Sequence, residues 1–303
     1  MLLKKIPDKR KLDPSETRQT FNDVNIKLFC CRYWMLEEWE FMDLSVPFWR
    51  LYHNTLPGAT VVFEDQKIAL GQDKVLIIPP HTSFSTQLRS GTSNKTSESV
   101  SGRKIERTDS LKCLQEQNKV DHLFIHFSLG FPLDFVRPAV YTVDCNESSS
   151  LLLDRIKDSC IAEGSVFSFT DCLLIKHLIL QQLASLPAGV WQFGKIDQRI
   201  FQTMQDIQRN PLEKVSNEGF AGRVNMAANS FARLFKANTG TSIQQYILKI
   251  KIEKACNLMH HSNKSIDEIA ADCGFSDRHH FSRVFKKIMN TSPAYYKKHL
   301  IMI

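Results

Sequence analysis

The chain of 303 residues lacks the patterns that would place it in a membrane or build it around disulfides or a structural metal ion. It has no apolar run long enough to cross a bilayer, so no transmembrane helix is expected. The basic residues after Met1 are not followed by a long apolar core, so no signal peptide is expected. The eight cysteines form no Cys-x-x-Cys pair and show no metal-binding spacing. Several of them lie among apolar residues, which indicates small buried side chains in a reducing, cytoplasmic compartment.

One stretch of the chain occurs twice. The hexapeptide from Phe231 to Lys236 (FARLFK) returns fifty positions later as Phe281 to Lys286 (FSRVFK), and Tyr246 returns at the same offset as Tyr296. A repeat that keeps one period in this way predicts two copies of one supersecondary unit.

Each copy has the pattern of a helix, a short turn and a second helix. In the second unit, Ser265 to Glu268 is a capping box, an apolar stripe follows at helical spacing, and Gly274 suits the left-handed residue that ends a helix. The first unit is weaker, with helices expected at about 218–224 and 228–237. A capping box at Ser242 opens a linker helix to about Met259, which would span about 30 Å at 1.5 Å per residue. Because one turn of DNA is about 34 Å, two helix-turn-helix units could enter successive major grooves of double-stranded DNA.

Polar and basic side chains lie on the outward side of the second helix in each unit. Such donors can reach base edges and phosphates in the major groove. For either unit alone, an amphipathic helix with a solvated basic face is an equal alternative, but two units, two capping boxes and the glycine turn favour DNA binding. The candidate DNA-binding residues are Asn229, Ala232, Arg233 and Lys236 in the first unit, and Arg278, His279, Ser282, Arg283 and Lys286 in the second.

The positive charge of the chain is concentrated in the segment that holds the repeat. Residues 195–303 contain 17 Lys and Arg against 9 Asp and Glu, whereas the rest of the chain contains 22 against 23. A segregated basic domain is the electrostatic signature of phosphate binding.

These motifs resemble the AraC/XylS family of bacterial transcription regulators over about residues 196–300. The resemblance rests on Ser265 to Ala270, Gly274-Phe275, Phe281 to Lys286, and Ser292-Pro293 to Tyr296. The resemblance implies that all the candidate DNA-binding residues except Lys236 and Lys286 contact base edges. Three positions depart from the family: Ala227 replaces a frequent Ser cap, Ala232 replaces a larger polar residue, and Lys251 replaces an Arg. The first unit is therefore expected to help position the protein on DNA and to add affinity, more than to select the base sequence.

The front of the chain predicts a β domain, which makes the whole chain α+β. Short β-rich runs at 48–53, 59–64, 67–70, 74–78, 121–128 and 139–143 are separated by turn residues, which is typical of a sandwich or small barrel. A looser resemblance to cupin-type sensors rests on strand order and on Ile77 to Thr82. Residues 90–109 are expected to form a mobile loop. The expected divisions are a flexible arm at 1–20, a cupin-like sensor at 21–147, a helical segment and linker at 148–194, and a DNA-binding domain at 195–303.

A small-molecule effector is expected in the β domain, because aromatic surface mixed with hydrogen-bond donors is typical of ligand pockets. The candidate pocket residues are Trp49, Arg50, Tyr52, His81 and His126, and a sugar is one candidate effector. No metal ion or other cofactor is expected. The histidines form no His-x-His pair, and His122 and His126, four apart on one strand, would be about 13 Å apart.

The sequence therefore predicts a cytoplasmic, homodimeric, DNA-binding transcriptional regulator that is controlled by an effector and is not an enzyme. The protein would contact RNA polymerase if it is an activator, and it would not contact a membrane. The helices expected at 148–186 either form the dimer or cap the β domain. One alternative is a metal-dependent cupin enzyme with an appended DNA-targeting domain. Another is a fused DNA-repair methyltransferase, which would need a clustered, reactive cysteine set that this sequence does not provide.

Overall fold

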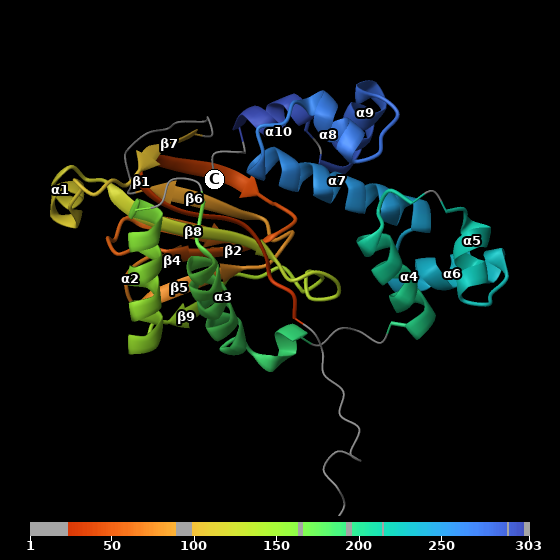
Figure 1. Cartoon of the computed structure of the whole chain (residues 1–303), viewed down its shortest axis with the longest axis horizontal. Helices are drawn as coiled ribbons and strands as arrows, with labels where there is room; N and C mark the ends of the chain where they lie inside the picture. The colour runs from red at the N-terminus through yellow and green to blue at the C-terminus, as the bar shows by residue number, and fades with distance from the viewer. Residues whose placement is uncertain are drawn as a thin grey trace, which may run out of the picture.

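The α+β class is confirmed by the computed structural model, which describes residues 24–88, 99–162, 166–191, 196–213, 215–289 and 291–299. A curled antiparallel sheet with flanking helices occupies the N-terminal part, and an all-helical domain occupies the C-terminal part (Figure 1). The expected arm at 1–20 lies outside the described residues. Among those residues, none of the helices has the length and hydropathy to cross a bilayer.

The sheet follows the order β4-β3-β6-β1-β8-β2-β5-β9, with β7 paired to β1. All strand pairs are antiparallel. Six strands match the predicted runs within two residues. The described strands are β1 (Lys27–Leu44), β2 (Trp49–His53), β3 (Ala59–Phe63), β4 (Gln66–Ala69), β5 (Lys74–Ile78), β6 (Phe84–Leu88), β7 (Ser99–Lys104), β8 (Val120–Ser128) and β9 (Tyr141–Asp144).

The prediction of a mobile loop over 90–109 is wrong for residues 99–104, and its first part, residues 90–98, lies outside the described residues. Residues 99–104 form β7, which pairs with β1 from Trp34↔Lys104 to Glu40↔Ser99. The sequence Ser-Val-Ser-Gly-Arg-Lys has little apolar character of its own. Its strand conformation comes from the hydrogen-bonding edge of β1, which spans 18 residues and pairs with β6, β7 and β8.

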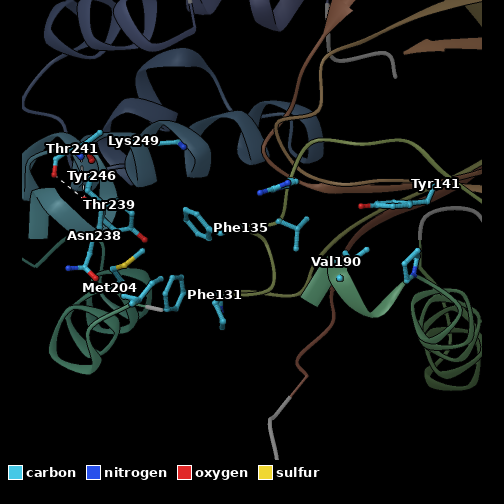
Figure 2. A pocket seen from close by; sticks show the side chains of 16 residues that line it. Phe131, Phe135, Tyr141, Val190, Met204, Asn238, Thr239, Thr241, Tyr246 and Lys249 are labelled. Carbon is cyan, nitrogen blue, oxygen red and sulfur yellow. Dashed lines mark hydrogen bonds between the residues drawn. The ribbon is translucent and has the colours of Figure 1, made fainter. Parts of the chain in front are cut away.

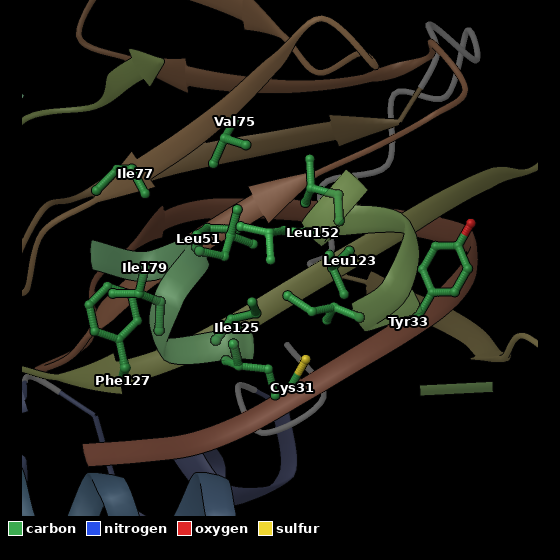
Figure 3. Close-up of a cluster of buried hydrophobic side chains, with 14 of the residues drawn as sticks. Cys31, Tyr33, Leu51, Val75, Ile77, Leu123, Ile125, Phe127, Leu152 and Ile179 are labelled. Atoms are coloured by element: carbon green, nitrogen blue, oxygen red, sulfur yellow. The ribbon is translucent and has the colours of Figure 1, made fainter. Parts of the chain in front are cut away.

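The two faces of the sheet bury two separate cores, and the alternating side chains of β8 contribute to both. Leu123, Ile125 and Phe127 belong to a core that the helices α2 (Glu147–Ala162) and α3 (Phe169–Ala184) cover (Figure 3). Val120 and Phe124 belong to a second core on the opposite, inner face, where Trp39 and Tyr52 also lie. Helices α2 and α3 therefore cap the β domain, which was one of the two roles considered for them. A short helix α1 (Leu111–Glu116) precedes β8, and a 3-10 turn (Ala188–Trp191) follows α3.

The C-terminal domain is built from two helical cores joined by one long helix. It comprises α4 (Gln198–Arg209), α5 (Asn217–Arg223), α6 (Ala228–Thr239), α7 (Ile243–His261), α8 (Ile266–Asp272), α9 (Arg278–Met289) and α10 (Pro293–His299). Helix α7 contributes to both cores and also contacts β1, so the helical domain lies against the sheet (Figure 1).

The sequence repeat is a structural repeat. Phe231 and Phe235 are fully buried in one helical core, and Phe281 and Phe285 are fully buried in the other. Phe235 meets Tyr246 edge-on at 5.6 Å and 72°, and Phe285 meets Tyr296 at 5.3 Å and 74°. The same edge-to-face contact at the same offset shows that the two units pack in the same way.

Candidate nucleic-acid interface

The turn of the second helix-turn-helix unit, between α8 and α9, is hydrogen-bonded to the linker helix α7. Gly274 adopts φ +69°, the left-handed conformation expected from the sequence. The Lys251 ammonium of α7 donates to the carbonyl of Gly274 at 3.2 Å, and Lys254 donates to that of Asp272 at 2.6 Å. Two lysines of the linker helix thus bind the carbonyls at the C-terminal end of α8, where a helix dipole favours positive charge.

Helix α9 presents its predicted DNA-binding side chains to solvent. Arg278, His279, Arg283 and Lys286 are exposed, whereas Ser282 is half-buried. All but His279 line a surface cavity of about 260 Å³ together with residues at the start of α10. Arg278 also forms an exposed ion pair of 3.1 Å with Asp267 of α8, which positions its guanidinium in the free protein. The helix begins at a firm cap, because the Asp277 carboxylate accepts the backbone N–H of His280 at 2.7 Å.

The first unit, α5 and α6, shows the weaker features that the sequence indicated. Asn225 takes the left-handed conformation in its turn, with φ 53°. Ala227 occupies the N-cap of α6 and makes no side-chain cap hydrogen bond. Beyond it, Asn229, Arg233 and Lys236 are exposed and Ala232 is half-buried. Both units therefore expose a polar, cationic helix face, but the first carries fewer donors.

The linker helix α7 separates the two units by a fixed length. Ser242 and Gln245 form the predicted capping box at its start. Its 19 residues correspond to about 28 Å at 1.5 Å per residue, which is close to one turn of DNA.

The candidate effector residues do not form one group. Arg50, Tyr52 and His126 are fully buried. The Arg50 guanidinium lies over the rings of Phe84 at 5.1 Å and Phe48 at 5.5 Å, and its nitrogens have no hydrogen-bond partner among the described residues. Trp49 lies in the core of the opposite face, where its indole donates to Asp134 at 2.9 Å.

His81 contacts the helical domain instead of the inner face of the sheet. Its Nε2 lies 3.1 Å from the Glu253 carboxylate of α7. Sequence reasoning could not find this contact, because the β-domain histidine and the linker-helix glutamate are far apart in the chain and no local pattern pairs them.

Two cavities lie between the β domain and the helical domain. One of about 850 Å³ has aromatic and basic walls, with Phe131 and Phe135 on the sheet side and Met204, Tyr246 and Lys249 on the helical side (Figure 2). The other, of about 680 Å³, lies between the sheet and α7, and is lined by residues that include Phe29, His81, Glu253 and His261.

Comparison with known proteins identifies the helical domain. A family described as a helix-turn-helix domain matches residues 220–299. The transcriptional activator RhaS from Salmonella schwarzengrund is 30% identical over 142 residues, which cover 47% of this chain and 49% of RhaS. RhaS from Salmonella agona is 32% identical over the same length. Residues 220–299 of this chain are therefore a helix-turn-helix domain. Its similarity to the RhaS activators supports the resemblance to AraC/XylS regulators and favours a regulator of transcription over an enzyme.

The chain spans about half the length of the curated relatives it matches. Over more of the chain, the helix-turn-helix domain and the β domain together are similar in fold to ToxT from Vibrio cholerae O395. The TM-score is 0.50 with 11% sequence identity, over 92% of this chain and 99% of ToxT. At that identity the likeness concerns the fold alone.

Proposed function

We propose that this protein is a sequence-specific DNA-binding regulator of transcription that acts in the cytoplasm, with its two helix-turn-helix units in successive major grooves. The observation that supports this most directly is the pair of exposed cationic faces on α6 and α9, joined by α7 of about one DNA turn in length. Arg233 and Arg283 have no ion-pair partner among the described residues, so both guanidiniums are available for DNA.

The two arginines are proposed to read base edges, with the lysines bound to phosphate. A bidentate arginine–guanine contact discriminates between bases by about 1–3 kcal/mol. Arg283→Ala is therefore expected to weaken binding to a selected site by about 5- to 150-fold, and to leave binding to random DNA much less affected. Lys286→Ala is expected to weaken both equally and to reduce the salt dependence of binding.

The experiment first selects a binding site from random DNA with the purified full chain, and then measures affinity for that site and for random duplex. Arg223→Ala is the matched control, because Arg223 is exposed in the same domain but pairs with Glu213 at 2.5 Å. Failure to enrich any sequence, or an equal loss for Arg283→Ala and Arg223→Ala, would refute sequence-specific reading by α9.

We further propose that a small-molecule effector binds on the inner side of the sheet and alters how α7 lies against it. The cavity of about 680 Å³ touches both the sheet and α7, so a ligand there can favour one arrangement of the two domains over another. Hydrogen-bond donors that line this cavity, among them Lys27, Arg209 and Asn257, suit oxygen acceptors such as sugar hydroxyls or a carboxylate. An effector that shifts DNA affinity must in turn be bound with altered affinity when DNA is present, which titration can measure.

A homodimer formed through α3 is the proposed assembly. Phe169, Leu173 and Leu180 expose 79%, 50% and 47% of their surface, and their spacing places them along one side of the helix. Phe169→Asp is expected to shift the protein from dimer to monomer in sedimentation, whereas Ser185→Asp, exposed just beyond the same helix, should not. Because both RhaS relatives are named as activators, activation through contact with RNA polymerase is the proposed direction of control.

A further inference from the structure

Three metal-ligating side chains from distant parts of the chain meet where α7 ends against the sheet. They are Cys30 on β1, His126 on β8 and His261, the last residue of α7. One ligand atom from each lies within 4.8 Å of the other two.

The fold holds these three side chains in place. Cys30 and His126 are direct cross-strand partners in the β1–β8 ladder. The His261 ring stacks on Phe29 at 5.1 Å with an interplanar angle of 12°, and it meets Phe48 edge-on at 5.3 Å. Phe48 also packs against the ring of His126, at 4.8 Å. Aromatic rings thus surround both imidazoles, while the sheet hydrogen bonds fix the backbone of Cys30 beside that of His126.

The imidazole nitrogens of this cluster have no other role among the described residues. Both ring nitrogens of His126 and both of His261 are buried without a hydrogen-bond partner. A buried polar atom left unpaired is unfavourable, and native proteins pair nearly all of them. A metal ion would bind one nitrogen on each ring and so remove part of this deficit.

We propose that Cys30, His126 and His261 bind a zinc ion that bridges the β domain and the linker helix. One thiolate and two imidazoles are a ligand set that zinc prefers, with Zn–S of about 2.3 Å and Zn–N of about 2.0–2.1 Å. Tetrahedral ligands at these lengths lie about 3–4 Å apart, so small side-chain rotations from the observed separation complete the site. The fourth position remains open.

Two cationic side chains, Arg32 and Arg50, lie near enough to the cluster to act electrostatically on Cys30 and on both histidines. Because zinc with one thiolate keeps a positive charge near Arg50, the fourth ligand should be an anion such as chloride or a carboxylate.

Such a site would couple metal binding to the position of the DNA-binding units. His261 belongs to the same helix that binds the carbonyls of α8 through Lys251 and Lys254. Zinc bound between β1, β8 and α7 would favour the arrangement in which α7 lies against the sheet. His261 also lines the cavity proposed for the effector, so the two sites adjoin, but metal affinity does not depend on whether the protein binds DNA.

The test measures metal binding by the full chain after removal of metals with a chelator. Zinc is expected to bind with one equivalent per chain, and cobalt(II) to give the near-ultraviolet charge-transfer band of a thiolate–cobalt bond. Cys30→Ser should abolish that band, and His261→Gln should weaken zinc binding by about 100-fold or more, since even outer-shell changes cost 10–100-fold. Cys113→Ser is the matched control, because Cys113 is exposed on α1 and outside the cluster.

A second measurement distinguishes loss of the metal site from loss of folding in the variants. Zinc should raise the melting temperature of the native protein and of Cys113→Ser, but not that of Cys30→Ser, whose circular dichroism should match the native spectrum. The proposal is overturned if native protein binds no stoichiometric zinc, or if Cys30→Ser keeps the full cobalt band. It is also overturned if zinc stabilises all variants equally. DNA is absent from these measurements, so their failure would leave the DNA-binding proposal standing.

Discussion

Helix α6 begins without a side-chain cap. Adding a cap there tests whether the two repeated units are structurally equivalent at this position. Ala227 sits at its N-cap and accepts no backbone N–H through its side chain. At the equivalent position fifty residues on, the carboxylate of Asp277 accepts the N–H of His280 at 2.7 Å. We predict that Ala227→Ser stabilises the first helix-turn-helix unit.

The expected size of the gain follows from the local geometry. Serine at an N-cap is worth about 1 kcal/mol over alanine, within a range of about 0.5–2 kcal/mol. Ala227 already has φ −68° and ψ 141°, near the φ −64° and ψ 163° of the capping residue Ser265, so the backbone need not change. The position is exposed, so the hydroxyl loses little hydration. Serine is preferable to aspartate because a carboxylate there would repel DNA phosphate.

Thermal and urea unfolding of the full chain provide the assay. For a domain of about 100 residues, 1 kcal/mol raises the melting temperature by roughly 4–8 °C. Asp277→Ala is the reciprocal change, and it should lower the transition of the helical domain by a similar amount and so identify it. An unchanged or lower melting temperature for Ala227→Ser, with a native circular dichroism spectrum, would show that the two units are not equivalent at this position.

Three further predictions follow from buried or strained positions. Phe281→Ala should destabilise the second unit by about 3–5 kcal/mol, because Phe281 is fully buried, and a loss below about 1 kcal/mol in urea unfolding would contradict this. Gly274→Ala should cost about 1–3 kcal/mol in the same assay, because φ is +69° and a Cβ would lie 2.9 Å from a Leu212 methyl carbon. Burial lowers the pKa of His122 to about 3, so this ring stays neutral in the folded state while the unfolded chain protonates near pH 6.5. The free energy of unfolding should therefore fall as pH drops below about 6.5. His122→Gln should reduce the slope of this free energy against pH by about one proton, or about 1.4 kcal/mol per pH unit. An unchanged slope would count against burial of His122 as the cause.

The helical domain was predictable because its determinants are local. Capping boxes at Ser242 and Ser265, the left-handed Gly274 and the spacing of Phe281 and Phe285 each act within a few residues, and each appears in the structure as predicted. Helical spacing alone would place Ile288 on the inward face of α9, but this side chain exposes 36% of its surface near the end of the helix. At a helix end, periodicity does not decide what covers a residue.

The β domain was less predictable because strands depend on partners distant in the chain. The first strand, Lys27–Leu44, was not recognised, because it mixes charged and apolar residues along 18 positions and changes partner from β8 to β6. The predicted effector group failed to gather for a related reason. Trp49 and Arg50 are neighbours in sequence, but successive strand residues point to opposite faces of the sheet.

The sequence by itself determined the repeat, the helix boundaries of the DNA-binding domain and the exposure of its arginines, because helix formation and amphipathic spacing are local properties. Only the tertiary structure decided which distant groups meet, such as His81 with Glu253, and Cys30 and His126 with His261. Those contacts depend on how α7 lies against a curled sheet, and that placement results from packing between domains that no short stretch of sequence encodes.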